Sequence, residues 1–291
     1  MFIDLHNHTT YSDGRKTVKE VLKLAEENHV KVISITDHDS IEGVKEFLNS
    51  NLLFKGIFVP GCEVTVCHKG LPIEILAYGF DYKKFENFII KKNKKENKLG
   101  DLTKAKGLYR HFKSIDKNFN CEKPVLEDEI WSHHAATWKV FYKGLENPII
   151  KNAIIKECGE KSTLSRGLFL RRGLNNPNSS FYVDVSKVFV NVDETISAIH
   201  NSGGIAVLAH PLLYTGEFDV LEELWSKIDG IECFHISAHG ETRQLIKFAK
   251  KHKKIITGGS DFHGETNRPF NSMKISYRYD KKIKPFLKKV Y

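Results

Sequence analysis

The chain has 291 residues, a hydrophobic content of 41% and a net charge of +9, and this length suits a single α/β barrel with insertions. No apolar run approaches the roughly 18 residues that a membrane-spanning helix needs, and the N-terminal MFIDLHNHTT lacks the basic and apolar regions of a signal peptide. The five cysteines are odd in number and show no CxxC spacing, so we expect reduced thiols in a cytoplasmic protein that does not enter a membrane. The oligomeric state is not predictable from the sequence.

Short apolar segments rich in Ile and Val predict seven strands. They are FIDLH (2–6), VKVISITDH (30–38), IFVPGCEVT (57–65), IEILAYGF (73–80), GIAVLAHP (204–211), GIECFHIS (230–237) and KIITGGSDFH (254–263). Helical spacing of apolar residues occurs between them, at 17–29, 192–204 and 241–254. Strands that alternate with helices indicate parallel strands joined by helical crossovers.

The alternation stops at about residue 84 and resumes after 188. The segment between is rich in lysine and has helical periodicity, which predicts a helical insertion (84–188) within a single barrel domain of residues 1–291. From Lys84 to Arg172 there are 20 Lys and Arg against 11 Asp and Glu, a difference of +9 that equals the net charge of the chain. Such a run is commonly a solvated helix face, but it can also attract an anionic substrate.

Side chains of the metal-ligand type stand at the C-terminal ends of five of the predicted strands. They are His6 and His8, Asp37 and His38, Glu63, His210, and Asp261 and His263. One histidine at a strand end is more often an ordinary polar residue. Several buried imidazoles and carboxylates together are costly unless they are paired or bind cations, and the carboxyl ends of barrel strands meet at one mouth. We therefore predict a metal centre there, with His38 pointing inward and its neighbour Asp37 in a supporting position.

The motifs DLHNHTTYSDG, ITDHDS, PGCEVT, AVLAHP and GGSDFHG occur in this order. In this combination the chain resembles the polymerase and histidinol phosphatase (PHP) family of metal-dependent phosphoesterases, over residues 1–82 and about 183–265. The resemblance implies a distorted seven-stranded (β/α) TIM-like barrel that holds two or three divalent ions of Mn, Zn or Fe. It implies three ligand sets: His6, His8, Glu63 and Asp261; Asp13, His38 and His263; and Glu63 again with His210 and one more residue.

The chain departs from the family pattern at two positions. Glu74 stands where relatives carry the last histidine ligand, and a carboxylate can also bind Mn, Fe or Zn. In the segment SRGLFLRRG, Leu168 stands where relatives carry a histidine between two arginines, which here are Arg166 and Arg171. These changes leave two ligand sets complete and alter the third.

The resulting prediction is a metal-dependent phosphoesterase that acts on a small anionic substrate, a phosphorylated metabolite or nucleotide, through a metal-bridging hydroxide. His235 is the candidate proton donor to the leaving group. Arg166 and Arg171 either clamp a phosphate or are surface arginines. One alternative is an exonuclease on short RNA or DNA, but a basic strand interleaved with aromatic residues, which would favour a nucleic-acid partner, is not evident. The other is a hydrolase of a different bond, such as an amide, which Glu74 and Leu168 favour.

Overall fold

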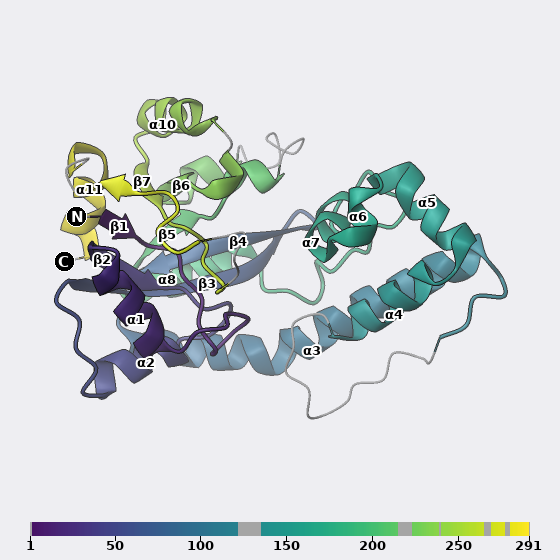
Figure 1. The fold of residues 1–291 in the computed structure, drawn as a ribbon, viewed down its shortest axis with the longest axis horizontal. Coiled ribbons are helices and arrows are strands. Elements are labelled where there is room, and N and C mark those ends of the chain that lie inside the picture. The colour runs from purple at the N-terminus through teal and green to yellow at the C-terminus, as the bar shows by residue number, and fades with distance from the viewer. Residues whose placement is uncertain are drawn as a thin grey trace. The chain divides into compact units, whose positions relative to one another are not determined.

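The computed structural model describes residues 2–121, 135–214, 223–238, 240–264, 269–276 and 280–290 (Figure 1). The chain divides into two compact units. The first comprises Met1–Val66, Ile73–Ile90 and Val192–Tyr291, and the second comprises Cys67–Pro72 and Lys91–Asn191. Each unit has a hydrophobic core of its own, so the two are described separately.

The first unit is built on a mixed sheet in which the described residues form eight strands. All seven predicted strands are present, and β8 is an additional short strand. The order across the sheet is β7-β6-β5-β4-β3-β2-β1-β8. The bounds are β1 (Phe2–Asp4), β2 (Val30–Ile35), β3 (Ile57–His68), β4 (Leu71–Tyr78), β5 (Ile205–Leu208), β6 (Gly230–Phe234), β7 (Ile255–Gly258) and β8 (Ile275–Ser276).

The sheet curls until its two halves almost meet. Strands β1, β2 and β3 are parallel to one another, as are β5, β6 and β7. The amide of Leu5, just after β1, donates to the carbonyl of Gly258 in β7 at 3.2 Å, and Asn7 forms a parallel bridge with Phe262. The result is a nearly closed barrel, which confirms the predicted α/β barrel class.

The expectation that the predicted strands are all parallel is wrong at β4, which runs antiparallel to β5. Strand β4 follows β3 after a two-residue turn of Lys69 and Gly70, whose φ angles are 49° and 84°. Two successive left-handed residues make a tight hairpin, whereas a parallel crossover needs about a dozen residues or more. As a consequence Glu63 and Glu74 lie within long strands and not at strand ends.

Helices cover the barrel from outside. Helix α1 packs against β2, α8 against β5, α10 against β6 and α11 against β7 (Figure 1). Helix α1 begins with a capping box, in which the Thr17 hydroxyl accepts from the Glu20 amide at 3.3 Å and the Glu20 carboxylate accepts from the Thr17 amide at 2.8 Å. The bounds are α1 (Val18–Glu27), α2 (Glu42–Asn49), α8 (Val192–Asn201), α10 (Thr242–Lys251), α11 (Asp280–Val290) and the short turns η2 (Pro211–Tyr214), η3 (Glu223–Ser226) and η4 (Ile236–Ala238).

Apolar side chains fill the barrel interior. Ile3 and Leu5 of the first strand region meet Leu76 and Tyr78 of β4 and Val207 of β5. The Tyr78 hydroxyl donates to the carbonyl of Leu5 at 2.8 Å, so its one polar atom is satisfied across the barrel. On β4 the face that carries Leu76 and Tyr78 also carries Glu74, which lies nearer the barrel mouth.

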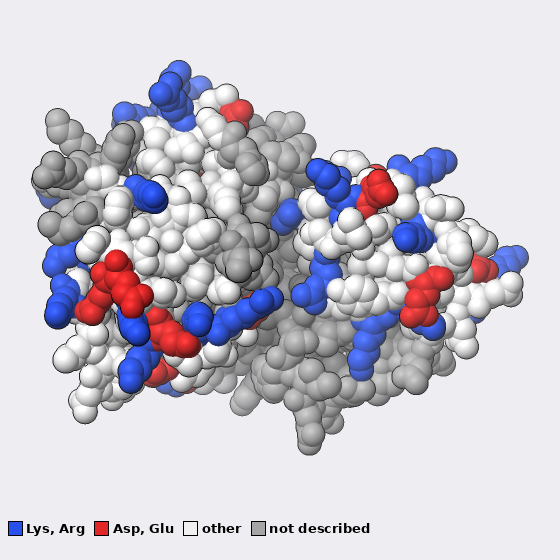
Figure 2. Space-filling view, in the orientation of Figure 1, with Lys and Arg blue, Asp and Glu red and all other residues white. Residues whose placement is uncertain are grey.

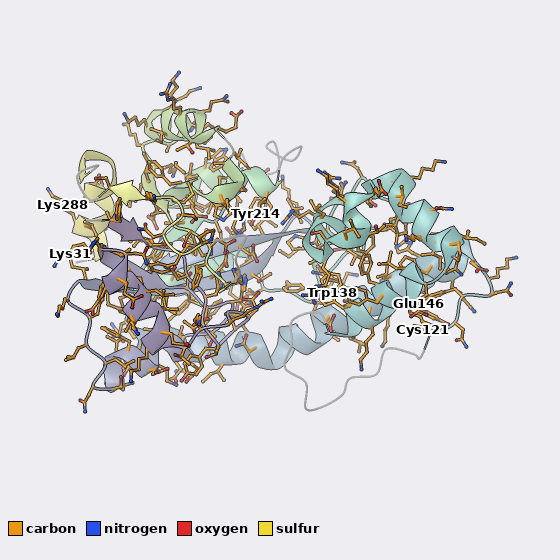
Figure 3. The ribbon with its side chains drawn as sticks, in the orientation of Figure 1. Lys31, Cys121, Trp138, Glu146, Tyr214 and Lys288 are labelled. Carbon is orange, nitrogen blue, oxygen red and sulfur yellow. The ribbon has the colours of Figure 1, made fainter. Side chains whose placement is uncertain are left out.

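The second unit is helical and packs around aromatic side chains. Phe112, Phe141, Phe169 and Phe181 are buried there together with Trp138, which Figure 3 labels. Its elements are the later part of α3 (Tyr82–Ile115), α4 (Ala135–Leu145), α5 (Pro148–Cys158), α6 (Lys161–Leu164), α7 (Arg166–Phe169) and the π-helical turn η1 (Leu170–Leu174). On the face shown in Figure 2, lysines and arginines are spread over this unit with acidic residues between them and do not gather in one patch. None of the described helices of the chain is long and apolar enough to cross a membrane.

The capping box makes α1 a test of local stability. Thr17→Ala should lower the free energy of unfolding by about 1 kcal/mol, because it removes the acceptor for the Glu20 amide at the start of the helix. Lys23→Ala, on the exposed face of the same helix, should change it by less than about 0.5 kcal/mol. Chemical denaturation followed by circular dichroism measures both, and equal effects of the two changes would contradict the cap's role.

Candidate metal centre

Four buried ligand-type side chains converge at the mouth of the barrel. His6 and His8 follow β1 and, two residues apart, turn toward the same place. The Nε2 atom of His6 lies 3.2 Å from Glu63 Oε2 and 3.4 Å from Asp261 Oδ1. The Nε2 atom of His8 lies 3.3 Å from each of the same two oxygens. Four donor atoms from β1, β3 and the end of β7 thus surround one point.

The spacing of these atoms fits a divalent cation. Donors at about 2.0–2.1 Å from a tetrahedral ion lie about 3.3–3.4 Å from one another, which agrees with the distances above. Neither ring nitrogen of His8 has a hydrogen-bond partner of acceptable geometry, although the residue is fully buried. A buried imidazole without a hydrogen bond is unfavourable, and a cation would satisfy it.

A second group lies on the other side of His8. Asp13 Oδ1 lies 3.3 Å from His263 Nε2 and 3.7 Å from His8 Nδ1, and Asp13 Oδ2 lies 3.8 Å from His38 Nε2. The rings of His8 and His263 are stacked with their centroids 4.1 Å apart. His8 therefore stands between the two groups, one nitrogen facing each, whereas the family resemblance placed it in the first set alone.

A third group forms around Glu74. One of its oxygens lies 3.0 Å from His210 Nε2 and the other 3.7 Å from His38 Nδ1. Glu63 reaches the same two histidines, at 3.0 Å to His210 Nε2 and 3.2 Å to His38 Nδ1. The carboxylate of Glu74 thus points into the cluster, and its role as a metal ligand stays a prediction.

The family model for the PHP domain matches residues 4–147. That range holds the motifs around His6, His38 and Glu63, and the barrel brings His210, Asp261 and His263 to them from later in the chain. The chain contains a PHP domain. The resemblance found in the sequence is thereby confirmed.

Curated relatives of this PHP protein share about a quarter of its residues. It is 26% identical over 276 residues to a 5'-3' exoribonuclease of Haemophilus influenzae, covering 89% of each chain. It is 25% identical over 275 residues to a phosphoribosyl 1,2-cyclic phosphate 1,2-diphosphodiesterase of Eggerthella lenta, covering 92% of this chain and 96% of the relative. It is 26% identical over 283 residues to a 3',5'-nucleoside bisphosphate phosphatase of Chromobacterium violaceum, covering 91% and 89%.

Two solved structures resemble this fold over nearly its whole length. One, from Bifidobacterium adolescentis, is described as a metal-dependent phosphoesterase and superposes with a TM-score of 0.65 at 20% identity over 98% of this chain and 95% of that one. The other is an amidohydrolase from Chromobacterium violaceum with bound sulfate, with a TM-score of 0.62 at 21% identity over 96% and 95%. At these identities the likeness supports the fold alone.

The histidines and carboxylates of the cluster shift one another's pKa values. Burial by itself lowers the pKa of His8 and of His210, but the neighbouring carboxylates raise the pKa of each to about 10. Burial by itself raises the pKa of Glu63 and of Asp261, but the facing histidines, His6 foremost, hold the pKa of both carboxyls well below its ordinary value. Without a cation His8 and His210 therefore hold protons, which an incoming metal ion must displace, so metal affinity should fall as the pH is lowered.

The solvent exposure of the side chains shows which side of the cluster is open. His6, His8 and Glu63 are inaccessible to solvent, whereas Asp13 is half exposed and Glu74 is partly exposed. A substrate can therefore reach the groups around Asp13 and Glu74 directly, and the first group lies beneath them.

Asp37 supports the loop that carries two of the candidate ligands. One of its oxygens accepts hydrogen bonds from the Thr9 amide at 2.7 Å and the Ser12 hydroxyl at 2.6 Å, and the other accepts from the Thr9 hydroxyl at 2.7 Å. Thr9 and Ser12 lie on the loop between His8 and Asp13. Asp37 therefore fixes this loop while its neighbour His38 faces the cluster, in the arrangement expected from their opposite directions.

Two residues near the cluster were not predicted from the sequence. Glu232, in β6, is fully buried beside His6 and His210. The hydroxyl of Tyr214, which Figure 3 labels, accepts from the amide of Glu74 at 2.9 Å, and its ring lies 5.8 Å from that of His210. A glutamate inside the apolar segment GIECF was a usable signal, because a buried charge needs a partner. Tyr214 offered none.

The predicted proton donor His235 lies in the first unit, and the two predicted arginines lie in the second. His235 is buried, with Nε2 3.3 Å from Asp261 Oδ2. Arg166 and Arg171 belong to the second unit, on α7 and η1. The Arg166 guanidinium lies 5.5 Å from the centre of the Trp138 ring, and Arg171 packs against Gly167. Contact of either arginine with a substrate stays a prediction.

The first group yields a direct test of metal binding. His8→Ala should remove at least one bound divalent ion per chain, because His8 contributes a nitrogen to each of two neighbouring groups. The metal content of chelator-stripped and reloaded protein, measured by mass spectrometry with circular dichroism as a check on folding, decides this. His200→Ala, which changes a half-exposed histidine paired with Asp229, is the matched control and should keep the full metal content. A folded His8→Ala protein with undiminished metal would contradict the assignment.

Proposed function

We propose that the chain is a metal-dependent phosphoesterase whose substrate is a small phosphorylated metabolite or nucleotide. The observation that carries this is a set of four buried donor atoms in which each of two imidazole nitrogens lies 3.2–3.4 Å from each of two carboxylate oxygens, in a chain that contains a PHP domain. The relatives named above act, by their names, on phosphoric esters, and two of the three act on small molecules.

We propose two divalent ions, with a third at Glu74, and the donors suit Mn, Zn or Fe because imidazole and carboxylate bind all three. His6, His8, Glu63 and Asp261 would hold the first. Divalent ions at these positions supply positive charge against developing phosphoryl charge and lower the pKa of water. The surrounding residues of the chain exclude water from the donor atoms and hold them at fixed positions. The substrate binds at the partly exposed groups around Asp13 and Glu74.

The third position can be tested through Glu74. Glu74→Ala should lower the metal content by one ion per chain and leave the two other ions bound, because His210 would lose one of its two facing carboxylates. Glu86→Ala, which changes a carboxylate paired with Lys45, should leave the content unchanged. Equal metal contents in wild type and Glu74→Ala would remove Glu74 from the ligands.

We further propose that the predicted insertion, 84–188, acts as a cap that selects an anionic substrate through Arg166 and Arg171. These two arginines lie on one short stretch of the second unit. The Arg171 guanidinium nitrogens come within 3.6 and 3.8 Å of the point where a Cβ on Gly167 would lie, and Gly167 is next to Arg166. Stacking on Trp138 restricts the Arg166 side chain, and a restricted guanidinium loses less entropy when it binds phosphate.

A kinetic panel separates the substrate classes. Nucleoside monophosphates, nucleoside bisphosphates, sugar phosphates, short oligonucleotides and an N-acyl amide should be compared with wild type, Arg166→Ala and Arg171→Ala at two salt concentrations. We expect the fastest turnover on a small phosphoester and a tenfold to hundredfold loss of kcat/KM, roughly 1.5–3 kcal/mol, in each arginine variant. Arg110→Ala, an exposed arginine bonded to its own helix, should behave as wild type.

The second candidate is exoribonuclease activity. It is favoured by the relatives that carry this name and by the excess of lysine and arginine between 84 and 172. Higher kcat/KM on a 5'-phosphorylated oligonucleotide than on any mononucleotide, with steep salt dependence, would place it first. Faster hydrolysis of the amide than of every phosphoester would reject phosphoester chemistry altogether.

A further inference from the structure

Strand β6 contributes no predicted ligand to the cluster, yet two buried polar side chains, one within it and one directly after it, contact residues that follow three other strands. Glu232 is fully buried and His235 is 2% exposed. We propose that β6 is the orienting strand of the metal centre. Glu232 and His235 are positioning residues that set the ring orientation and backbone of ligands from β1, β5 and β7. This inference rests on the proposed metal-dependent function.

Glu232 determines the tautomer of the His6 ring. Its Oε1 lies 3.0 Å from His6 Nδ1, and a carboxylate can only accept, so His6 Nδ1 carries the proton. In the neutral ring this leaves the lone pair on Nε2, the nitrogen that faces Glu63 and Asp261. A hydrogen bond from the second ring nitrogen to a carboxylate fixes the tautomer of a metal-ligating histidine and increases its basicity.

The other oxygen of Glu232 holds the backbone of His210. Oε2 accepts from the His210 amide at 2.8 Å. His210 has a φ of 25°, in the left-handed region that non-glycine residues rarely adopt. A charge-assisted hydrogen bond offsets part of this strain, and it keeps the imidazole of His210 directed at Glu63 and Glu74. One buried carboxylate therefore links a ligand from β1 to a ligand from β5.

The tautomer of His235 follows from Ser237. The Ser237 amide donates to His235 Nδ1 at 3.1 Å. A backbone N–H can only donate, so Nδ1 is an acceptor and the proton of the neutral ring is on Nε2. That Nε2 is buried, has no hydrogen-bond partner of good geometry, and lies 3.3 Å from Asp261 Oδ2.

His235 thus faces the oxygen of Asp261 that the first group does not use. Asp261 Oδ1 is the atom near His6 and His8, and Asp261, like His210, has a left-handed backbone, with a φ of 52°. The positive end of the His235 Nε2–H dipole lies 3.3 Å from Oδ2, and this electrostatic attraction keeps Oδ1 directed at the cluster. A proton donor to a leaving group would need its N–H to reach the open side, so this placement argues against the catalytic role expected for His235 from the sequence.

The same three side chains could instead form a cation site, since His6, Glu232 and His235 each offer an atom within 4.8 Å of the others. Two observations favour positioning. The 3.0 Å contact between His6 Nδ1 and Glu232 is a direct hydrogen bond. A cation there would also require His6 to give up its Nδ1 proton and bridge two metals. The metal count in the following experiment separates the two.

The test compares His235→Gln with His235→Asn. The amide nitrogen of glutamine reaches about as far as Nε2, whereas that of asparagine reaches only to Nδ1. Apoprotein prepared with a chelator is titrated with Co²⁺, whose visible absorption reports ligand geometry, and with Mn²⁺ followed by electron paramagnetic resonance. We expect His235→Asn and His235→Leu to bind the tightest ion about 10- to 100-fold more weakly with a changed Co²⁺ spectrum, and His235→Gln to recover most of the affinity and the spectrum.

Glu232→Gln gives an independent measurement on the same strand. A glutamine side chain has one acceptor oxygen, and two donors face it, the His6 ring and the His210 amide, so one is left unsatisfied. We expect a loss of metal affinity of similar size with an unchanged number of ions at saturation. His252→Gln, a histidine stacked on Phe248 beyond α10, is the control and should bind as wild type. Circular dichroism of each apoprotein verifies folding.

The outcomes are distinct. Wild-type affinity and spectra in His235→Asn and Glu232→Gln would overturn the inference and leave the proposed function standing. Loss of a complete equivalent of metal at saturation in both would also overturn it, by making these residues ligands. If wild type itself binds neither Mn²⁺ nor Co²⁺, the metal-dependent function fails, and the inference fails with it. Should His235→Leu not fold, the Gln and Asn pair decides the result by itself.

Discussion

The buried carboxylate of Glu63 is the interaction on which the geometry of the centre depends. One oxygen lies within 3.3 Å of a nitrogen on each of His6, His8 and His38, and the other lies 3.0 Å from His210. An isolated carboxylate in this position would cost several kcal/mol. The barrel is therefore stable around Glu63 only while histidines from three other strands, or cations between them, face it. Because β3 continues through the site, Glu63 is held by a regular strand and not by a loop.

A layer of further buried carboxylates lies behind the candidate ligands and holds their loops. Asp37 fixes the loop between His8 and Asp13 through three hydrogen bonds. Asp4 accepts from the amide and hydroxyl of Ser260, next to Asp261, and burial raises the pKa of Asp4 to about 6. Such partners matter because His210 and Asp261 adopt left-handed backbone conformations, which persist only where the surroundings over-determine them.

Much of the fold was predictable because its signals are local. Each of the seven predicted strands is a short apolar run, and the start of helix α1 is marked in the sequence by the capping-box residues Thr17 and Glu20. The direction of β4 also depends on a local feature, the Lys69–Gly70 turn. The apolar run by itself does not distinguish a parallel strand from the second strand of a hairpin. Strand β8 has two residues, too few for any periodicity, and forms only because the edge of β1 is available to it.

The sequence by itself determined which side chains have ligand chemistry and where along the strands they stand. Spacing and strand position are local properties, so His6, His8, His38, His210, Asp261 and His263 could be named together with Glu63. Only the tertiary structure decided which atoms meet. His6 and Glu232 are 226 positions apart, and His8 faces two groups at once, as a result of how the strands curl and close. Those contacts depend on the register and curvature of the whole sheet, to which every strand contributes and which no single segment encodes.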